Sequence, residues 1–417
     1  MLHDTAKVEE NVVLAAVDTD NGDFDVESSL NELAELAKTA GAVVKGQLTQ
    51  KLDKPNNAHY LGSGKLDELR DLINLHDADA VIFDDELSPA QLRNLSDKFD
   101  VKIIDRTALI LDIFASRANS AEGKAQVEMA QLNYRLSRLT GLGKSMSRLA
   151  GGIGTRGPGE SKLEHDRRHI RNRIDTLRAE LNEIEGKRAV VRKGRDDVTV
   201  ISMVGYTNAG KSTLMNQLTN AGVLAEDKLF ATLETTTRRV NLPSGTQALF
   251  TDTIGFIQKL PHHLIKAFRA TLEELNHADI LVHVVDASNP SLGEQMKTVY
   301  NTLSNLGCDD KPIITIFNKM DVVSPFAVIP NDEQATHVCR ISALNGEGKN
   351  ELLECLEGVI KSFKKPMSVL IPFNEGQLFG LIHKKCEIIR EEHTENGTFF
   401  ELFANDEMQS RLEHFIS

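Results

Sequence analysis

The sequence predicts an α/β protein organised around a doubly wound parallel sheet, and three observations support this. A β-branched run, residues 198–204, is typical of a buried parallel strand and leads through a glycine-rich loop into a helical pattern. Apolar strands alternate with amphipathic helices over residues 1 to about 115, and again from 197 to 364. A chain of 417 residues also suggests two to four domains.

Changes in composition along the chain predict four parts. Residues 124–139 and 161–192 are long helical patterns, and a glycine-rich segment, residues 141–159, separates them. This arrangement is typical of a helical hairpin with a loop at its tip. We expect a small parallel α/β domain (1–115), the hairpin with its Gly/Arg-rich loop (116–196), the doubly wound domain (197–364) and a small α+β domain (365–417).

The N-terminal part contains no recognisable catalytic motif. Its third expected strand, residues 80–83, ends in three acidic residues, Asp84, Asp85 and Glu86. Carboxylates at a strand end can bind a metal ion. We favour the alternative, a charged strand end exposed to solvent.

Composition limits the class of protein. The chain is 41% hydrophobic and 26% charged, which is ordinary for a globular protein. It has no apolar run long enough for a membrane span, and its first residues do not resemble a signal peptide. Its four cysteines form no C-x-x-C pair, which favours thiols in a reducing compartment, so we expect a cytoplasmic protein. A net charge of −13 argues against a coat of nucleic acid over the whole surface.

The hairpin is locally basic within this acidic chain. Between Arg135 and Arg173 there are ten Lys/Arg and three Asp/Glu, a local charge of +7. Arginines beside glycines allow guanidinium and backbone groups to approach phosphates, so we favour an RNA-binding surface. A solvated hairpin with ordinary salt bridges is the alternative. Residues 152–157 match G-x-G-x-x-G, but no strand precedes them, so we do not expect a dinucleotide site.

The loop after residues 198–204 matches the phosphate-binding pattern G-x-x-x-x-G-K-[ST] in full. Strand, loop and helix follow one another here, as a P-loop requires. We expect its backbone N–H groups to bind phosphate, Lys211 to reach the β- and γ-phosphates as a catalytic residue, and Ser212 to hold Mg²⁺. The motif comprises Gly205, Tyr206, Thr207, Asn208, Ala209, Gly210, Lys211, Ser212 and Thr213.

A D-x-x-G motif lies at the end of the strand expected at residues 248–253. In such a motif the aspartate binds the metal through water, and the glycine N–H contacts the γ-phosphate. We therefore count Gly255 with Lys211 as catalytic. The motif comprises Asp252, Thr253, Ile254 and Gly255.

Two motifs after the next strands identify the base. The Asp321 carboxylate can accept hydrogen bonds from N1–H and the 2-amino group of guanine, and adenine offers neither donor. A backbone N–H at Ser342 or Ala343 can bind the guanine O6. The motifs are Asn318, Lys319, Met320 and Asp321, followed by Ser342, Ala343 and Leu344. Together, these motifs predict GTP binding by a P-loop GTPase domain.

The segment between the P-loop helix and D-x-x-G contains four threonines, at positions 232, 235, 236 and 237. One of them should bind Mg²⁺ and the γ-phosphate only in the GTP state. We favour Thr232 as this metal ligand and keep Thr236 as the second candidate.

Two positions concern hydrolysis. Phe256 stands where Ras-like GTPases have a glutamine that orients the attacking water, so we expect slow intrinsic hydrolysis. A compatible alternative is that another side chain orients the water. Asn208 resembles the asparagine that ligates K⁺ in cation-activated GTPases; its alternative role is to favour the turn.

These residues resemble the HflX family of ribosome-associated GTPases, within the Obg–HflX group. The resemblance covers nearly the whole chain. It is most specific at residues 151–168, which lie outside any generic GTPase pattern. It rests on GYTNAGKST (205–213), LFATLETTTRR (229–239), DTIGF (252–256), NKMD (318–321), SAL (342–344) and GGIGTRGPGESKLEHDRR (151–168).

The resemblance implies where the first switch lies. In the family, the matching stretch forms switch I, which supports Thr232 as a metal ligand. Glu234 and Thr235 stand where the family usually has Asp-Pro, a departure that bears on the rigidity of the switch rather than on the metal site. The stretch comprises Phe230, Ala231, Thr232, Leu233 and Glu234.

The resemblance also implies a partner and a task. It implies a GTPase that binds the large ribosomal subunit and its rRNA, and dissociates or rescues stalled ribosomes under stress. The hairpin and N-terminal domain would approach the peptidyl-transferase region, and the ribosome would complete the hydrolytic site by ordering the switches. A GTP-dependent RNA-modification or assembly factor and a signalling switch with protein partners remain alternatives. We expect a monomer.

Overall fold

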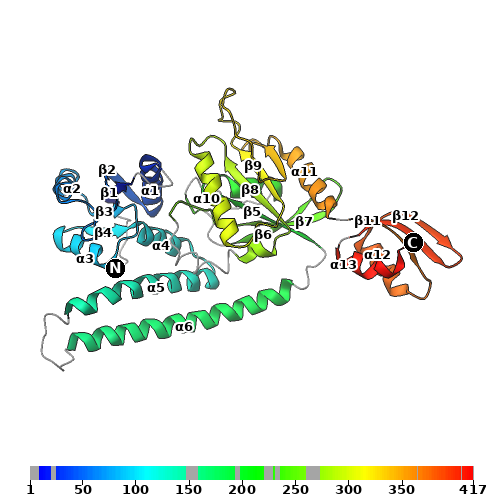
Figure 1. The fold of residues 1–417 in the computed structure, drawn as a ribbon, viewed down its shortest axis with the longest axis horizontal. Helices are drawn as coiled ribbons and strands as arrows, with labels where there is room; N and C mark the ends of the chain where they lie inside the picture. Colours follow the sequence, from blue (N-terminus) through cyan, green and yellow to red (C-terminus); the bar gives the residue numbers. More distant parts are fainter. Residues whose placement is uncertain are drawn as a thin grey trace, which may run out of the picture.

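The computed structural model describes residues 9–19, 25–146, 158–192, 198–219, 229–230, 235–259, 273–363, 365–404 and 406–416. Figure 1 shows an elongated molecule with one α/β unit at the N-terminal end, a second at the centre and a smaller unit at the C-terminal end. Two long helices run along one side of the N-terminal unit, and the second of them continues toward the central unit.

The N-terminal unit is a four-stranded parallel sheet with strand order β2-β1-β3-β4. Residues 12–17 of β1 are buried, because helices cover both faces of the sheet. The helices start at clear signals: the Asp25 side chain caps α1, and Ser88 and Gln91 form a capping box on α3. The elements are β1 (Glu10–Asp18), α1 (Val26–Ala40), β2 (Ala42–Lys51), α2 (Ser63–His76), β3 (Ala80–Phe83), α3 (Pro89–Lys98), β4 (Lys102–Asp105) and α4 (Arg106–Arg117).

The two long helices, α5 (Ala121–Met146) and α6 (Pro158–Arg192), pack against each other. Apolar side chains, including Val127 from α5 and Leu177 from α6, are buried, and Arg173 forms two 2.7 Å hydrogen bonds with Glu128 across the pair. The predicted loop is shorter than expected, because α5 continues through Gly141 and Gly143 to Met146. Residues 152–157 lie outside the described residues.

The central unit is a six-stranded sheet with strand order β10-β9-β8-β5-β7-β6, in which only the β6–β7 pair is antiparallel. The sequence did not predict β6, since its residues are mostly polar and only Val240 is buried. The elements are β5 (Thr199–Gly205), α7 (Lys211–Thr219), β6 (Thr236–Asn241), β7 (Gln247–Asp252), η1 (Glu273–His277), β8 (Ile280–Asp286), α10 (Leu292–Asn305), β9 (Ile313–Asn318), β10 (His337–Arg340) and α11 (Lys349–Ser362).

The C-terminal unit is a three-stranded antiparallel sheet with order β11-β13-β12. Its own core includes Val369, Ile382, Phe400 and Met408. The elements are β11 (Lys365–Ile371), α12 (Gly376–Lys385), β12 (Glu387–Thr394), β13 (Gly397–Ala404), α13 (Asp406–Leu412) and η2 (Glu413–Phe415).

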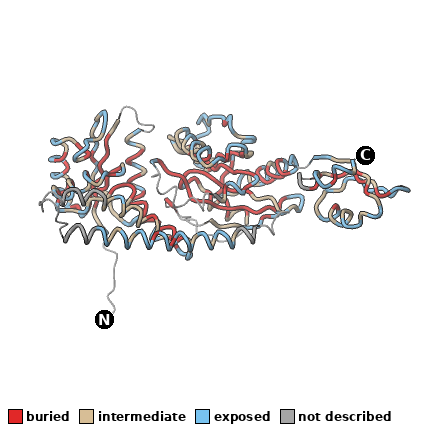
Figure 2. The backbone as a smooth tube through the Cα atoms, turned by 60° about the horizontal axis from the view of Figure 1, so that its bottom comes forward, coloured by how far each residue is buried: buried red, intermediate tan, exposed pale blue. Residues whose placement is uncertain are grey.

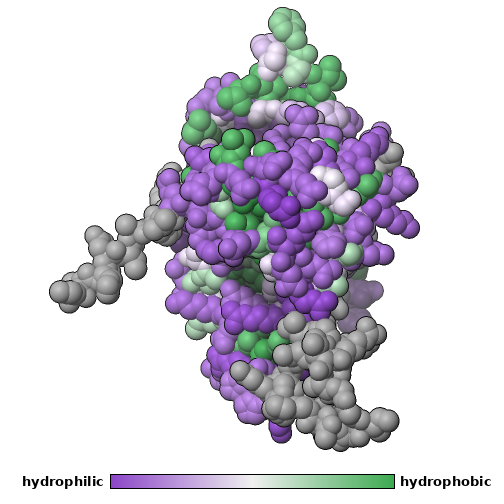
Figure 3. All heavy atoms as spheres, turned by 90° about the vertical axis from the view of Figure 1, so that its left-hand side faces the viewer, coloured by the Kyte–Doolittle hydropathy of each residue, from purple (hydrophilic) through white to green (hydrophobic). Residues whose placement is uncertain are grey.

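These units confirm the predicted fold class: a doubly wound sheet with a parallel α/β unit and long helices before it. Figure 2 shows the buried residues gathered in the interiors of the N-terminal and central units. The face in Figure 3 is mostly hydrophilic. Among the described residues, no helix is both long and apolar enough to cross a bilayer. The four domain boundaries and the monomeric state stay predictions.

The prediction of a solvent-exposed acidic strand end is wrong for Asp84, although Glu86 is exposed. Asp84 is not solvated: it is 0% exposed and hydrogen-bonds Ser29 Oγ at 2.7 Å and Arg106 Nη1 at 2.7 Å. The described residues also contain no group of three or more His, Cys, Asp or Glu that could hold a metal ion. The carboxylate is therefore part of a buried ion-pair cluster.

A buried histidine lies in the central unit, on the face of the sheet covered by α10. His283 on β8 is 1% exposed, and its ring packs edge-to-face on Tyr300 at 5.2 Å. Burial is the main reason that its pKa falls to about 4; the nearby Lys211 lowers it as well, while Asp332 opposes the shift.

We expect His283 to make the protein less stable in acid. The His283 imidazole binds a proton near pH 6.5 in the unfolded chain, but only near pH 4 in the folded chain. Its contribution to the free energy of unfolding is therefore complete above pH 6.5 and is lost as the pH falls toward 4. The loss should be about 2–3 kcal/mol between pH 7 and 4.5. Urea unfolding at these two pH values should show a smaller pH effect for His283→Phe than for wild type. An equal pH effect in wild type and variant would contradict the assignment of this acid sensitivity to His283.

Candidate functional site

The P-loop joins β5 to α7, and two glycines allow its tight path. Gly205 has φ +151, and a Cβ there would lie 2.2 Å from the Val284 carbonyl oxygen. Gly210 has φ +95, and a Cβ there would lie 2.2 Å from Asn318 Nδ2. Asn208 has φ +61, a left-handed conformation that asparagine adopts more readily than most residues. The loop backbone is therefore held close to the neighbouring strand ends.

Lys211 is buried at the start of α7, with 6% of its surface exposed. Its Nζ donates to the carbonyl oxygens of Gly205 at 3.0 Å and Tyr206 at 2.8 Å. Burial lowers the pKa of Lys211 to about 8, and the nearby Asp252 carboxylate opposes this shift. A cation that is so incompletely compensated attracts an anion such as a nucleotide phosphate.

The predicted metal ligands of the P-loop and the D-x-x-G motif meet. Ser212 Oγ donates to Asp252 Oδ2 at 2.8 Å, which brings together a hydroxyl and a carboxylate 40 positions apart. Oxygen donors of this kind suit Mg²⁺, so the residues present fit the ion expected for a GTPase. Thr253 lies just behind this pair, with its hydroxyl bonded to the Met203 carbonyl at 2.6 Å.

The D-x-x-G turn lies against the P-loop. The Phe256 N–H bonds the Gly205 carbonyl at 3.1 Å, and the Thr207 N–H bonds the Phe256 carbonyl at 2.8 Å. A Cβ at Gly255 would lie 2.8 Å from Thr207 Cα and 3.0 Å from Lys211 Nζ, so only glycine fits. Phe256 itself is 2% exposed and packs with apolar residues of the core, so it offers no group to orient water.

Asn318 connects three of the predicted motifs. Its Nδ2 donates to the Ala209 carbonyl of the P-loop at 2.8 Å, and its Oδ1 accepts from the Ala343 N–H at 2.8 Å. One side chain at the end of β9 therefore links the P-loop to the loop after β10. The sequence marked Asn318 as a nucleotide-binding residue but did not predict this bridge.

The predicted base-binding residues also lie together. Ser342 Oγ donates to Asp321 Oδ1 at 2.6 Å, which orients the carboxylate. Lys319 has φ +64, and its Nζ is 2.7 Å from Asp286 Oδ2 at the end of β8. Leu344 is 71% exposed at the edge of this region, whereas Ala343 is buried.

The structure describes only part of the predicted switch I. Phe230 is 2% exposed and has φ +55, while Ala231, Thr232, Leu233 and Glu234 lie outside the described residues. Thr236, the second candidate for the metal ligand, begins β6 and pairs with Asp252 in the sheet.

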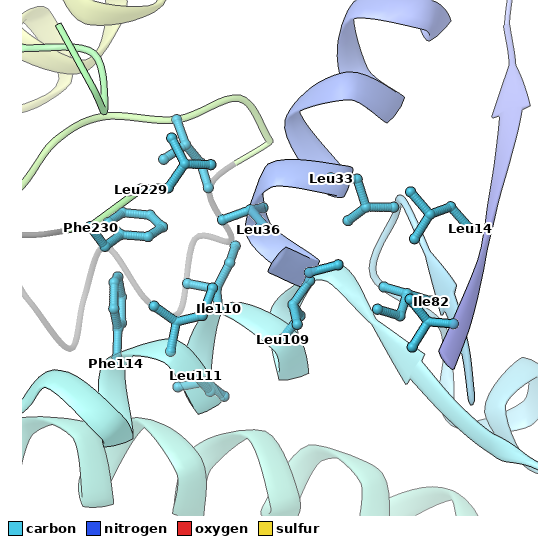
Figure 4. Packing of buried hydrophobic residues seen from close by; sticks show 14 of the residues in the cluster. Leu14, Leu33, Leu36, Ile82, Leu109, Ile110, Leu111, Phe114, Leu229 and Phe230 are labelled. Carbon is cyan, nitrogen blue, oxygen red and sulfur yellow. The ribbon is translucent and has the colours of Figure 1, made fainter. Parts of the chain in front are cut away.

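The N-terminal unit packs directly on the P-loop, on the start of the predicted switch I and on residues in and after the D-x-x-G motif. Leu229, Phe230, Ile254 and Ile257 share one apolar cluster with residues of α1 and α4. Figure 4 shows Phe230 beside Phe114, whose ring centroids are 4.6 Å apart in an edge-to-face arrangement. Phe230, the first residue of the predicted switch I, is therefore part of the core of another unit.

Polar contacts follow the same interface. The Tyr206 hydroxyl bonds Glu32 of α1 and accepts the Gln258 N–H at 2.7 Å. Glu32 also pairs with Arg106, which is 1% exposed. Burial raises the pKa of Glu32, while the Arg106 guanidinium opposes this shift.

Lys259 completes the contact beside the D-x-x-G motif, which is the expected second switch. Its Nζ lies 2.5 Å from Asp84 Oδ2 and 2.8 Å from Asp85 Oδ1, and its backbone has φ +50. Sequence reasoning missed Glu32, Arg106 and Lys259 as neighbours of the site. The only signal was the acidic run at the end of β3, which was assigned to solvent.

Three family models match consecutive segments of the chain. A model described as GTP-binding GTPase N-terminal matches residues 27–115, and one described as GTP-binding GTPase Middle Region matches residues 117–195. A third, described as 50S ribosome-binding GTPase, matches residues 200–319.

Individual relatives resemble the whole chain. A protein named GTPase HflX from Lacrimispora saccharolytica is 52% identical over 408 residues, which cover 97% of this chain and 96% of that protein. GTPase HflX from Escherichia coli strain K12 is 38% identical over 380 residues, covering 90% and 89%. The solved structure of a complex of SsGBP and GDP has a TM-score of 0.47 at 22% identity, covering 84% of this chain and 98% of that one.

The full-length similarity and the matched GTPase model lead to one conclusion about activity. The chain binds GTP and GDP and hydrolyses GTP, in a class of enzymes that generally uses Mg²⁺. It belongs to the HflX family of GTPases.

Proposed function

We propose that this GTPase binds the large ribosomal subunit through its rRNA and uses its GTP cycle to split or rescue stalled ribosomes under stress. The observation that supports this best is the match of residues 200–319 to the model described as 50S ribosome-binding GTPase. The basic hairpin formed by α5 and α6 gives such a protein an RNA-binding surface. This function also places the protein in the cytoplasm.

The nucleotide-binding motifs lie close together in the structure, and we assign the nucleotide contacts from this arrangement. Asp321, oriented by Ser342, would accept hydrogen bonds from guanine, and the backbone beside Ala343 would bind O6. Lys211 and the P-loop N–H groups would hold the β- and γ-phosphates. Gly255 would donate its N–H to the γ-phosphate, at a place where a side chain would clash with Thr207.

Ser212 and Thr232 would hold Mg²⁺, with Asp252 acting through water. The 2.8 Å contact between Ser212 and Asp252 supports the roles given to these two residues. When bound, the ion would neutralise charge on the β- and γ-phosphates.

Phe256 offers no group to orient the attacking water, and the interface suggests how a partner could complete the hydrolytic site. Phe230 and Lys259, which flank the switches, contact the N-terminal unit, and that unit is joined to α5. A ribosome that binds the hairpin and the N-terminal unit would therefore act on both switches through packed contacts.

We expect large subunits to accelerate GTP turnover by at least about tenfold, because the ribosome would order the switches. Turnover with and without purified large subunits measures this, alongside co-sedimentation with a non-hydrolysable GTP analogue and with GDP. Equal turnover together with no co-sedimentation would refute the ribosomal function. Co-sedimentation confined to the GTP analogue would support it over a signalling switch, and unmodified RNA in a deletion strain would argue against an RNA-modifying enzyme.

We also propose that Asn208 holds a K⁺ ion beside the phosphates. The cation would stabilise negative charge in the transition state, so turnover should be faster in KCl than in NaCl at equal ionic strength. Assays in the two salts, with Asn208→Ser as the comparison, measure this. Identical turnover would leave Asn208 with only its conformational role at φ +61.

A further inference from the structure

A cavity of about 440 Å³ lies between α5 and α6. Three residues from each helix line it, and each set has the spacing i, i+3, i+4, so each is one helix face. Leu139 and Ile170 are only partly buried, whereas Val127 and Leu177, farther along the two helices, are buried. The lining residues are Arg135, Arg138, Leu139, Asp166, His169 and Ile170.

The walls of this cavity combine apolar and cationic groups. Leu139 and Ile170 supply an apolar surface, one from each helix, against which a flat ring can lie. Arg135 is exposed and forms no ion pair with the described residues, so its guanidinium is available to an anion. The His169 imidazole offers a flat ring for stacking, and the Asp166 carboxylate offers a hydrogen-bond acceptor.

The cavity is preformed by contacts behind it. The Arg138 guanidinium lies 3.4 Å from the centre of the Tyr134 ring, bonds Asp105, and donates to the Leu87 carbonyl at 3.3 Å. On the other helix, Arg167 Nη2 donates to the Leu139 carbonyl at 2.8 Å. A ligand would therefore meet fixed walls and lose little free energy to reorganisation.

We propose that this cavity binds a single unpaired nucleotide of structured RNA. The cavity lies within the range of small-ligand pockets, about 300–1,000 Å³. Its apolar walls suit a base, Arg135 suits the phosphate, and Asp166 can accept a hydrogen bond from an exocyclic amino group.

RNA is the occupant because of charge. The segment from Arg135 to Arg173 has a net charge of +7 in a chain of −13, which favours a polyanion over an apolar peptide. Proteins read RNA sequence mainly at unpaired bases, which can leave the helix stack and enter a pocket. This inference rests on the proposed ribosomal function and specifies how the hairpin would hold rRNA.

The test uses the full-length protein and a fluorescein-labelled 12-nucleotide single-stranded RNA of mixed sequence, alone and annealed to its complement. Ile170→Glu places a carboxylate in the cavity, while Asn172→Glu adds the same charge on the exposed face of the same helix. We expect Ile170→Glu to weaken single-strand binding by at least about tenfold, and Asn172→Glu by less than about threefold. Duplex binding should respond equally to both substitutions.

A second pair of variants keeps the test independent of folding. Arg135→Ala should weaken single-strand binding and reduce the slope of log affinity against log salt by about 0.7, the value for one phosphate contact on a single strand. Arg178→Ala, an exposed arginine farther along α6, should leave the slope unchanged. Basal GTP turnover reports folding and should match wild type in all four variants.

The proposal is overturned if Ile170→Glu and Asn172→Glu bind single-stranded RNA equally well, or if Arg135→Ala behaves as Arg178→Ala does. Wild-type protein that binds duplex as tightly as single strand would overturn it too. Co-sedimentation of the wild-type protein with large subunits is measured separately. Its absence would reject the ribosomal function, whereas the oligonucleotide assays decide whether the cavity binds a nucleotide.

Discussion

Asp321→Asn should weaken GTP binding by about a thousandfold and give the protein affinity for xanthosine triphosphate. The carboxylate can accept both N1–H and the 2-amino group of guanine, and an amide leaves the 2-amino group facing another donor. Xanthine carries an oxygen at that position, which the amide N–H can bind. Ser342 Oγ lies 2.6 Å from Asp321 Oδ1, and an amide oxygen there can keep this hydrogen bond.

Fluorescence titration with GTP, ATP and xanthosine triphosphate measures this change. Asp310→Asn, at an exposed position before β9, is the matched control and should bind GTP as wild type does. Wild-type protein that binds ATP as tightly as GTP would contradict the assignment of Asp321 to guanine.

Lys211→Met should abolish GTP turnover, with a loss of at least about a hundredfold, and yet stabilise the nucleotide-free protein. Methionine fills similar space without the charge that the β- and γ-phosphates need. The buried ammonium has a pKa of about 8, so at neutral pH its burial costs the folded state about 3 kcal/mol. The carbonyls of Gly205 and Tyr206 keep other donors, the Phe256 and Ala209 N–H groups.

Thermal unfolding without nucleotide tests whether Lys211→Met stabilises the protein, and turnover assays test whether it abolishes GTP hydrolysis. In the wild-type protein, the free energy of unfolding should rise between pH 8 and 10.5, because the unfolded chain still binds the Lys211 proton that the folded chain has lost. The variant should lack this rise. Lys297→Met, at an exposed position on α10, is the control. A variant less stable than wild type would contradict the argument that burial of this cation is costly.

Local patterns were sufficient for most elements and for the motifs. Strand β1 is a continuous apolar run, and α6 is a long charged segment with spaced leucines and isoleucines, so their positions followed from the local sequence. The P-loop was identified because its glycines, lysine and serine have fixed spacing between a strand and a helix. Helix α4 and strand β6 were missed: β6 shows little apolar alternation, and α4 begins directly at the end of β4.

Distant contacts could not be read from the chain. Asp84 looked like part of a solvated acidic run, but it is buried by Ser29, Arg106 and Lys259, the last of which is 175 positions away. The bridge from Asn318 to the P-loop and to Ala343 likewise joins three loops that are far apart in sequence.

By itself, the sequence determined the α/β class, most of the helices and strands, and the residue types that bind a guanine nucleotide, because each depends on spacing within a few turns of chain. Only the tertiary structure decided that the N-terminal unit packs on Tyr206, Phe230 and Lys259, and that a cavity opens between α5 and α6. These features depend on burial and charge pairing between segments that meet only when the chain is folded.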